Sequence, residues 1–130
     1  MLFRSSSFGG TISLTGGNVA VRDTTAVDLA LVAATGSLSV TAGGAITNSG
    51  NVSVAGAATF DATSANNITL NTNTVDFGSF NANGNTIDIA ENSSAVLGTV
   101  TAATDFTYVA NGAITDSGEI GRAPSELQSH

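Results

Sequence analysis

The sequence predicts an all-β fold, a single-stranded, right-handed parallel β-helix (a solenoid) of about six coils of roughly 20–23 residues. Three observations predict it. Expected strand starts mostly recur every six to ten residues, a longer motif at positions 44–50 returns at positions 112–118, and aromatic residues make up only 5% of the 130-residue chain. A thin core lined by Val, Ile, Leu and Ala needs few large side chains, whereas a compact globule needs more.

The strand pattern is a turn residue followed by two β-formers that are separated by one small residue. The pairs are Ile12/Leu14, Val19/Val21, Leu38/Val40, Val52/Val54, Ile68/Leu70, Ile87/Ile89 and Phe106/Tyr108. A period of two places each pair on one face of a strand. The Gly or Asn before a pair is expected to adopt positive φ and turn the chain. No segment shows a helical stripe.

Short, evenly spaced strands fit a sandwich, a barrel or a solenoid, and the longer repeat favours the solenoid. The motif GAITNSG at positions 44–50 returns as GAITDSG at positions 112–118. If a coil takes three strands, this shift is three coils. We therefore expect the two GAIT copies to stack on one wall, about 14 Å apart, in a rod about 29 Å long. In an antiparallel sandwich or barrel, the main alternative, the repeat would be incidental. The crossover rule favours a right-handed coil and leaves a left-handed one open.

The composition excludes several function classes. Charged residues are 10% of the chain, the net charge is −7, and there is no Lys and no Cys. A nucleic-acid footprint or an anionic membrane surface would need clustered basic residues. No apolar run approaches the length of a membrane span or of a signal peptide. If the protein is secreted, we expect its targeting signal to lie outside this sequence.

Three regions are expected along the chain. Residues 1–7 form an N-terminal end that is expected to be irregular. Residues 8–118 form the β-helix domain with its 68-residue super-repeat. Residues 119–130 break the pattern, because they hold the only Pro (Pro124) and the only His (His130), and are expected to be an irregular tail off the rod, either a natural linker or a non-native end.

No catalytic, cofactor or metal site is predicted, and the protein is not expected to be an enzyme. General acid–base chemistry needs paired carboxylates or a His with a partner. The acids of the body are spread singly and are expected to be solvated turn residues: Asp23, Asp28, Asp61, Asp76, Asp88, Glu91, Asp105 and Asp116. The Asp spacing does not match the tandem nonapeptide of calcium-binding β-rolls.

Other motifs have a structural interpretation that is favoured over a functional one. Thr72-Asn73-Thr74 and Thr99-Val100-Thr101 match the Thr-x-Thr of ice-binding β-helices but do not recur once per coil. Gly16-Gly17 and Gly43-Gly44 lack the Lys of a phosphate-binding loop and are interpreted as turn glycines.

Asparagines and aromatic residues supply two further groups of candidates. The three N-x-S/T sequons, at Asn51, Asn67 and Asn92, are expected to be unmodified, and turn asparagines are expected to form hydrogen-bonded ladders. Five aromatic residues either form an exposed carbohydrate-binding platform or fill corners of the core: Phe60, Phe77, Phe80, Phe106 and Tyr108. Of these, Phe106 is assigned to the core.

Runs such as GGTISLTGGNVAV, SLSVTAGGAITNSGNVSV, ANNITLN, VDFGSF and VANGAITDSG, over residues 8–118, resemble the internal repeats of filamentous-haemagglutinin-like adhesins and large exoproteins. The resemblance implies a right-handed parallel β-helix shaft that is secreted by a two-partner or similar route and displayed at the cell surface. The secretion domain of that family and a recognisable terminal cap are absent from this sequence.

The expected function is therefore a non-catalytic, extracellular β-helical segment of a bacterial adhesin-like exoprotein, either a passive shaft or directly adhesive repeats. Alternatives are an ice-binding or glycan-binding β-helix module, or a fragment of a polysaccharide-active enzyme. Expected partners are a host or neighbouring-cell glycan or protein, without nucleic acid or membrane insertion. Uncapped end coils are expected to favour self-association.

Overall fold

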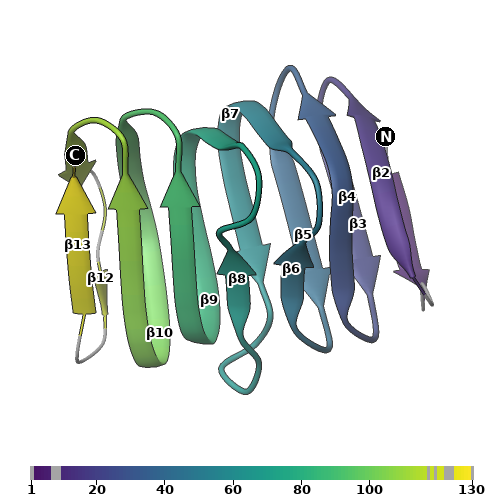
Figure 1. Cartoon of the computed structure of the whole chain (residues 1–130). Helices are drawn as coiled ribbons and strands as arrows, with labels where there is room; N and C mark the ends of the chain where they lie inside the picture. The colour runs from purple at the N-terminus through teal and green to yellow at the C-terminus, as the bar shows by residue number, and fades with distance from the viewer. Residues whose placement is uncertain (1, 7–9, 117, 119, 122–124, 130) are drawn as a thin grey trace.

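The computed structural model describes residues 2–6, 10–116, 118, 120–121 and 125–129, with side chains for residues 10–116 and 118. All described strands run parallel and form one continuous sheet that coils into a solenoid of about six turns (Figure 1). The predicted fold class is thereby confirmed, and the parallel pairing rules out the antiparallel sandwich. The right-handed sense of the coil stays a prediction from the crossover rule.

The strands follow one another with short connections. They are β1 (Leu2–Ser6), β2 (Thr11–Gly16), β3 (Val19–Asp23), β4 (Val27–Ala34), β5 (Leu38–Ala42), β6 (Ile46–Asn48), β7 (Val52–Asp61), β8 (Ile68–Leu70), β9 (Val75–Glu91), β10 (Ala95–Ala110), β11 (Ile114–Asp116), β12 (Ile120–Gly121) and β13 (Ser125–Ser129). The long strands β7, β9 and β10 bend around corners of the coil, so one strand contributes to more than one wall.

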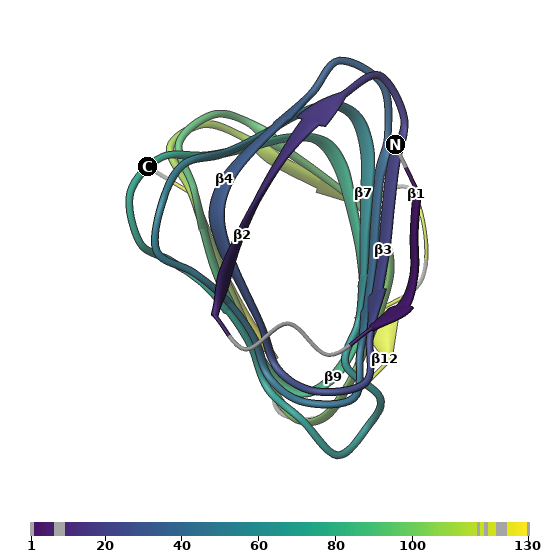
Figure 2. The same cartoon turned by 90° about the vertical axis from the view of Figure 1, so that its right-hand side faces the viewer.

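Viewed along its axis, the coil is three-sided (Figure 2). We call the walls face one, face two and face three, in the order in which the chain visits them. Face one contains β1, β3, β5, the second half of β7, the middle of β9 and of β10, and β12. Face two contains the start of β2 and of β4, then β6, β8, the ends of β9 and β10, and β13. Face three contains the rest of β2 and β4, the starts of β7, β9 and β10, and β11.

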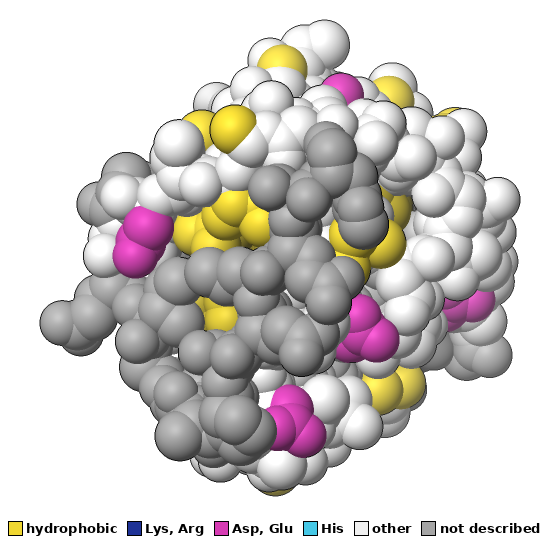
Figure 3. All heavy atoms as spheres, turned by 60° about the vertical axis from the view of Figure 1, so that its left-hand side comes forward, with side chains coloured by type: hydrophobic (Ala, Val, Ile, Leu, Met, Phe, Trp, Pro, Cys, Tyr) yellow, Lys and Arg dark blue, Asp and Glu magenta, His cyan; other side chains and the backbone are white. Residues whose placement is uncertain are grey.

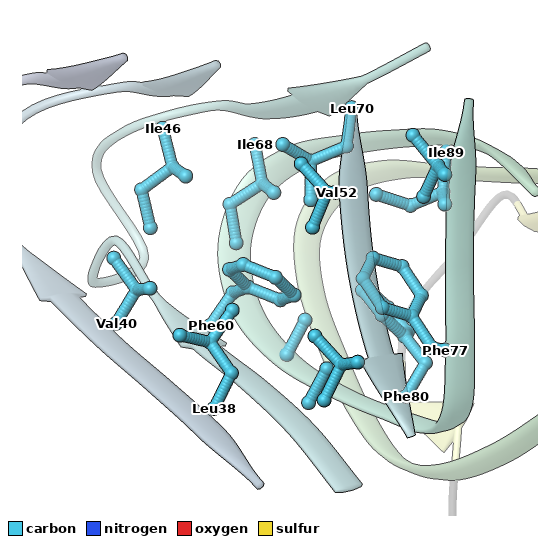
Figure 4. Packing of buried hydrophobic residues seen from close by; sticks show 14 of the residues in the cluster. Leu38, Val40, Ile46, Val52, Phe60, Ile68, Leu70, Phe77, Phe80 and Ile89 are labelled. Atoms are coloured by element: carbon cyan, nitrogen blue, oxygen red, sulfur yellow. The ribbon is translucent and has the colours of Figure 1, made fainter. Parts of the chain in front are cut away.

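The inward residues stack into apolar columns, as the period-two pattern predicts. On face two, Ile46 pairs with Ile68, Ile68 with Ile87, and Ile87 with Phe106, and all four are at most 1% exposed. Ile46 and Ile68 are shown in Figure 4. Burying one such side chain stabilises a fold by about 1.5–3 kcal/mol.

The spacing of paired residues gives the length of a coil. On face one, Val19 pairs with Leu38, and Leu38 pairs with Ala58 in the coil after it. Most other partners in neighbouring coils have a similar separation along the chain, although the step from Ile46 to Ile68 is longer. Most coils are therefore slightly shorter than predicted.

The phase of the 68-residue repeat differs from the prediction. On face two, three coil steps lead from Ile46 of the first GAIT copy to Phe106. Ile114 of the second copy comes after Phe106 and lies on face three, beside Ala95. The repeat therefore advances by three coils and one further face. The expectation that the GAIT copies stack on one wall was wrong, because it divided the repeat evenly into three coils.

Glycines at the corners allow close approach between coils rather than an unusual backbone angle. A Cβ added to Gly50 would lie 1.6 Å from the carbonyl oxygen of Ala30, and one added to Gly43 would lie 2.3 Å from that of Thr24. No described glycine has positive φ; Thr63 and Asn73 do. The prediction that glycines turn the chain through positive φ was therefore wrong for the described residues. Glycine is needed where one corner rests on the backbone of the neighbouring coil.

Asparagine side chains connect the corners of neighbouring coils, as expected. The Oδ1 atom of Asn18 accepts a hydrogen bond from the Ser37 amide (3.0 Å), and that of Asn81 accepts one from the Thr99 amide (2.9 Å). Asn85 donates to Oδ1 of Asn67 at 3.3 Å, which makes a short ladder. These bonds satisfy backbone donors that the strand ladder leaves at the turns.

The two end segments contribute strands within the described residues. β1 pairs with β3, and β12 and β13 pair with β10. The expectation of irregular ends, with the tail off the rod, is not met there, because the outer edges of β3 and β10 offer unpaired backbone groups to the next segment of chain. Pro124 and His130 lie outside the described residues.

Candidate functional site

The predicted acids do not share one environment. Asp76 and Asp116 are exposed, and Asp28, Asp61, Asp88 and Asp105 are half-buried. All six lie within strands, so the expectation that they are turn residues was wrong. Asp23 and Glu91, however, are only 2% and 4% exposed, and the assignment of these two as solvated was wrong. Both end a strand on an inward position, so the pattern that buries Val21 and Ile89 carries on to include the next inward residue.

Glu91 lies in the most elaborate polar cluster of the described chain. Its Oε1 accepts a hydrogen bond from the hydroxyl of Tyr108, and its Oε2 accepts from the amide of Phe77 (3.0 Å) and the hydroxyl of Ser93 (3.1 Å). The Ser93 hydroxyl also lies 2.7 Å from Oδ1 of Asp76. All groups that contact the two carboxylate oxygens of Glu91 are donors, which is the set an ionised carboxylate accepts.

Burial sets the acidity of the pair. It raises the pKa of Glu91 above its ordinary value, although the hydrogen bonds from Tyr108, Phe77 and Ser93 act in the opposite direction. The pKa of Tyr108 is raised as well, by burial first and then by its bond to Glu91. A carboxylate with raised pKa is often catalytic. Here the carboxylate is buried in the core, and the Ser93 hydroxyl bridges it to a second acid, Asp76.

The cluster fills an interruption in the backbone ladder of face three. Residues 75–77 pair with residues 52–54 on one side, but the register between β9 and β10 begins only at Phe80. Between them, the Asn92 side chain accepts from the Val75 amide at 2.9 Å, and the Glu91 carboxylate accepts from the Phe77 amide. Glu91 and Asn92 thus replace a missing strand partner, and their role is structural.

Among the residues whose side chains the structure describes, Asp23 and Asn48 are the other buried polar ones. Asp23 accepts from the amide and the hydroxyl of Thr25, both at 2.8 Å. Asn48 donates to the carbonyls of Gly50 and Thr72, which lie in successive coils. Each therefore closes a corner. Asp23 and Glu91 are equivalent by the 68-residue shift, and the buried corner acid is thus a feature of the repeat.

The aromatic residues lie in the core, not on the surface. Phe60, Phe77, Phe80, Phe106 and Tyr108 are 0–3% exposed, which confirms the core assignment of Phe106. The centroids of neighbouring rings lie 5.3–6.1 Å apart in a continuous cluster of tilted and edge-on contacts. Phe60, Phe77 and Phe80 are shown in Figure 4. A carbohydrate platform built from these rings is therefore excluded.

The two Thr-x-Thr segments do not form a flat array. Residues 72–74 lie in the loop between β8 and β9, whereas Thr99 and Thr101 lie on face one. Face two instead carries an outward column that the sequence motifs did not reveal, because each member lies one full coil from the next. The column consists of Thr11, Asp28, Thr47, Thr69, Asp88 and Thr107.

This column is hollowed near its N-terminal end, between Thr11, Asp28 and Thr47. The Oδ1 atom of Asp28 is buried there and has no hydrogen-bond partner among the described atoms. At the other end, Asn71 donates to Asp88 Oδ2 at 3.3 Å. The column is the best candidate surface for a polar ligand that the described residues provide.

The three sequon asparagines serve the fold. The Oδ1 atom of Asn51 accepts from the Thr74 amide (3.1 Å), that of Asn67 from the Thr86 amide (3.2 Å), and that of Asn92 from Val75. The carboxamides are thus engaged in corner contacts, which supports the structural interpretation of these sequons.

Among the residues that the structure describes, no three His, Cys, Asp or Glu side chains are grouped to hold a metal ion. The same part of the chain contains no helix that is long and apolar enough to cross a membrane. Acids are scattered over the face in Figure 3 and form no dense cluster there.

Stacked parallel coils, apolar inner columns and a sequence repeat define the class of the protein: a parallel β-solenoid repeat protein. A family model described as repeats of unknown function (DUF5649) matches residues 16–83 and again residues 83–123, and the chain belongs to this family. The first match is as long as the interval between the two GAIT copies. No curated protein and no solved structure matches the chain significantly.

Proposed function

We propose that the chain is a non-catalytic shaft segment of a secreted, adhesin-like bacterial exoprotein, displayed at the cell surface. A shaft needs a regular, self-supporting rod, and the dry inner columns and corner hydrogen bonds supply one. The resemblance of the repeats to filamentous-haemagglutinin-like exoproteins supports the extracellular setting. The low content of charged residues (10% of the chain) and the many Thr, Ser and Asn residues at outward positions agree with an extracellular setting.

One observation favours a shaft over a directly adhesive array of repeats. Because the repeat advances by three coils and one face, equivalent surface residues of successive repeats point in different directions. Thr47 of the first repeat lies on face two, and its equivalent Thr115 lies on face three. A flat ligand could therefore not contact the equivalent surfaces of two successive repeats on one side of the rod. The function of a shaft does not depend on which way these surfaces point.

The experiment duplicates one complete repeat, residues 16–83, within the full chain. A shaft is expected to lengthen by about 16 Å, three and one third coils at about 4.8 Å each, and to unfold as cooperatively as the parent. Small-angle X-ray scattering measures the length and circular dichroism the unfolding. An unchanged length or a loss of folding would contradict a modular shaft.

Glycan binding along face two is a second candidate, favoured by the outward column of Thr and Asp residues. A glycan array probed with the full chain tests it directly. Binding that is lost in Asp88→Ala, but kept in the control Asp76→Ala on face three, would replace the shaft by a direct binder. We expect no saturable binding to any glycan on the array.

A further inference from the structure

The sequence contains two Asn-Gly pairs, Asn83-Gly84 and Asn111-Gly112, and Ala precedes both of them. Asn followed by Gly is the pair that loses its side-chain amide most readily, because a residue without a Cβ lets its backbone nitrogen reach the Asn carboxamide. The shared Ala-Asn-Gly context gives the two pairs closely similar reactivity in an unfolded chain. A large difference between them in the folded protein must therefore come from the structure.

Asn83-Gly84 lies inside β9 on face one, where strands pair with it on both sides. Asn83 is paired with Asp61 in one neighbouring coil and with Thr101 in the other. Its carbonyl accepts a hydrogen bond from the Ala62 amide (2.9 Å), and its side chain donates to Oδ1 of Asp61 (3.1 Å). Gly84 is buried. Attack by the Gly84 nitrogen would require this peptide to rotate out of both ladders and the carboxamide to leave its partner.

Asn111-Gly112 lies in the corner between β10 and β11, outside the regular strands, and Asn111 is exposed. The exposure is a property of the corner. Asn92, the corresponding residue one coil earlier, is exposed as well although a further coil follows it. A Cβ at position 112 would lie 2.4 Å from Oγ of Ser94 and 3.1 Å from its Cα. The close approach of the two coils therefore favours the same glycine that makes Asn111 reactive.

We propose that Asn111 is a site of spontaneous deamidation in the folded protein and that the fold protects Asn83. The Gly112 nitrogen attacks Cγ of Asn111, the Cγ–Nδ2 bond breaks, and the side-chain nitrogen leaves as ammonia with the proton that the Gly112 amide gives up. Water then opens the cyclic imide at either carbonyl and yields aspartate or isoaspartate. Both products carry a carboxylate, and isoaspartate also inserts a methylene into the backbone of the corner. The proposal does not depend on the shaft function.

The test follows both sites in the same wild-type molecule. The full chain is incubated at mildly alkaline pH, and samples are taken over time and digested with chymotrypsin. Cleavage after Phe80, Phe106 and Tyr108 puts the two asparagines in separate peptides. Mass spectrometry measures the deamidated fraction of each peptide. We expect Asn111 to convert at least about tenfold faster than Asn83, because Asn83 must first open out of two strand ladders.

The same incubation in urea removes the ladders, and the two rates should then agree within about twofold. Asn111→Gln is expected to abolish most of the gain in negative charge of the folded protein. The matched control, Asn83→Gln, should leave that gain unchanged. Equal rates in the folded wild type, or faster conversion of Asn83, would overturn the proposal. It would also be overturned if Asn111 stayed intact in the folded protein while the chain in urea converted.

Discussion

Tyr108 donates a hydrogen bond to Glu91 across the boundary between two coils, and both residues lie within the core. The bond adds to the pairing of β9 and β10 at the corner where face three has no regular strand ladder and one backbone bond, from the Asn92 amide to the Val75 carbonyl (2.8 Å), joins the two coils. Buried carboxylates are costly unless their lone pairs are satisfied. Here three donors satisfy them. The cluster therefore links two coils, and its contribution to the free energy of unfolding depends on pH.

Because burial raises the pKa of Glu91, the folded state binds its proton more tightly than the unfolded state does. Stability from this group is then greatest below the ordinary pKa of 4.5 and declines as the pH rises through the raised, folded-state pKa. We expect Glu91→Gln to remove this decline. The measurement is the urea-unfolding free energy of both proteins from pH 4 to 8. Parallel pH profiles would show that Glu91 does not titrate as described.

Removing the donor should weaken the same corner. Tyr108→Phe leaves the ring in the aromatic stack and deletes one hydrogen bond to a buried carboxyl group. The expected cost at neutral pH is about 1.5–3 kcal/mol, the range for bonds to charged groups. In Glu91→Gln the same change should cost about 1 kcal/mol or less. Equal costs in the two backgrounds would argue against coupling between the residues.

Gly50 tests the close approach of coils. Its Cβ position lies 1.6 Å from the Ala30 carbonyl oxygen, so Gly50→Ala must displace backbone and should lower stability by about 3 kcal/mol or prevent folding. Gly17→Ala is the matched control, because its nearest neighbour is the Thr35 hydroxyl at 3.9 Å. The control should change stability by less than about 1 kcal/mol. Thermal and urea unfolding compare the pair.

Thr63 has a φ of 61°, a backbone conformation that β-branched residues disfavour. Asn73 adopts a φ of 60° and shows the residue type that tolerates it. We expect Thr63→Asn to stabilise the protein by about 0.5–1 kcal/mol. The same exchange at Thr59, on a regular strand, should not stabilise it. A loss of stability at position 63 would mean that the Thr63 hydroxyl, which accepts from the Ala65 amide, matters more than φ.

The sequence predicted features that depend on local alternation. Inward pairs such as Val52/Val54 and Ile87/Ile89 are buried, and the strands pair in parallel as the repeat suggested. This succeeded because a period of two is visible in any short segment and only a solenoid gives every such pair an inner face. The aromatic residues followed the same rule.

The features that could not be predicted depend on the number of residues in each coil. The length of a coil is the sum of three strands and three corners, and small differences in corner length decide which face a residue reaches. The loop before Ile68 and the loop before Val75 lengthen one coil, and no local sequence motif predicts the extra residues. The burial of Glu91 and the column of Thr47, Thr69 and Asp88 were missed for the same reason.

Dipolar spectroscopy on pairs of spin labels tests the arrangement of the coils most directly, since the chain has no native Cys to interfere. The pair Thr47→Cys/Thr107→Cys lies on face two, three coils apart, so we predict about 14 Å between backbones. The pair Thr47→Cys/Thr115→Cys, one repeat apart, spans two faces and should give the longer distance. A shorter distance for 47/115 than for 47/107 would contradict a repeat that advances by three coils and one face.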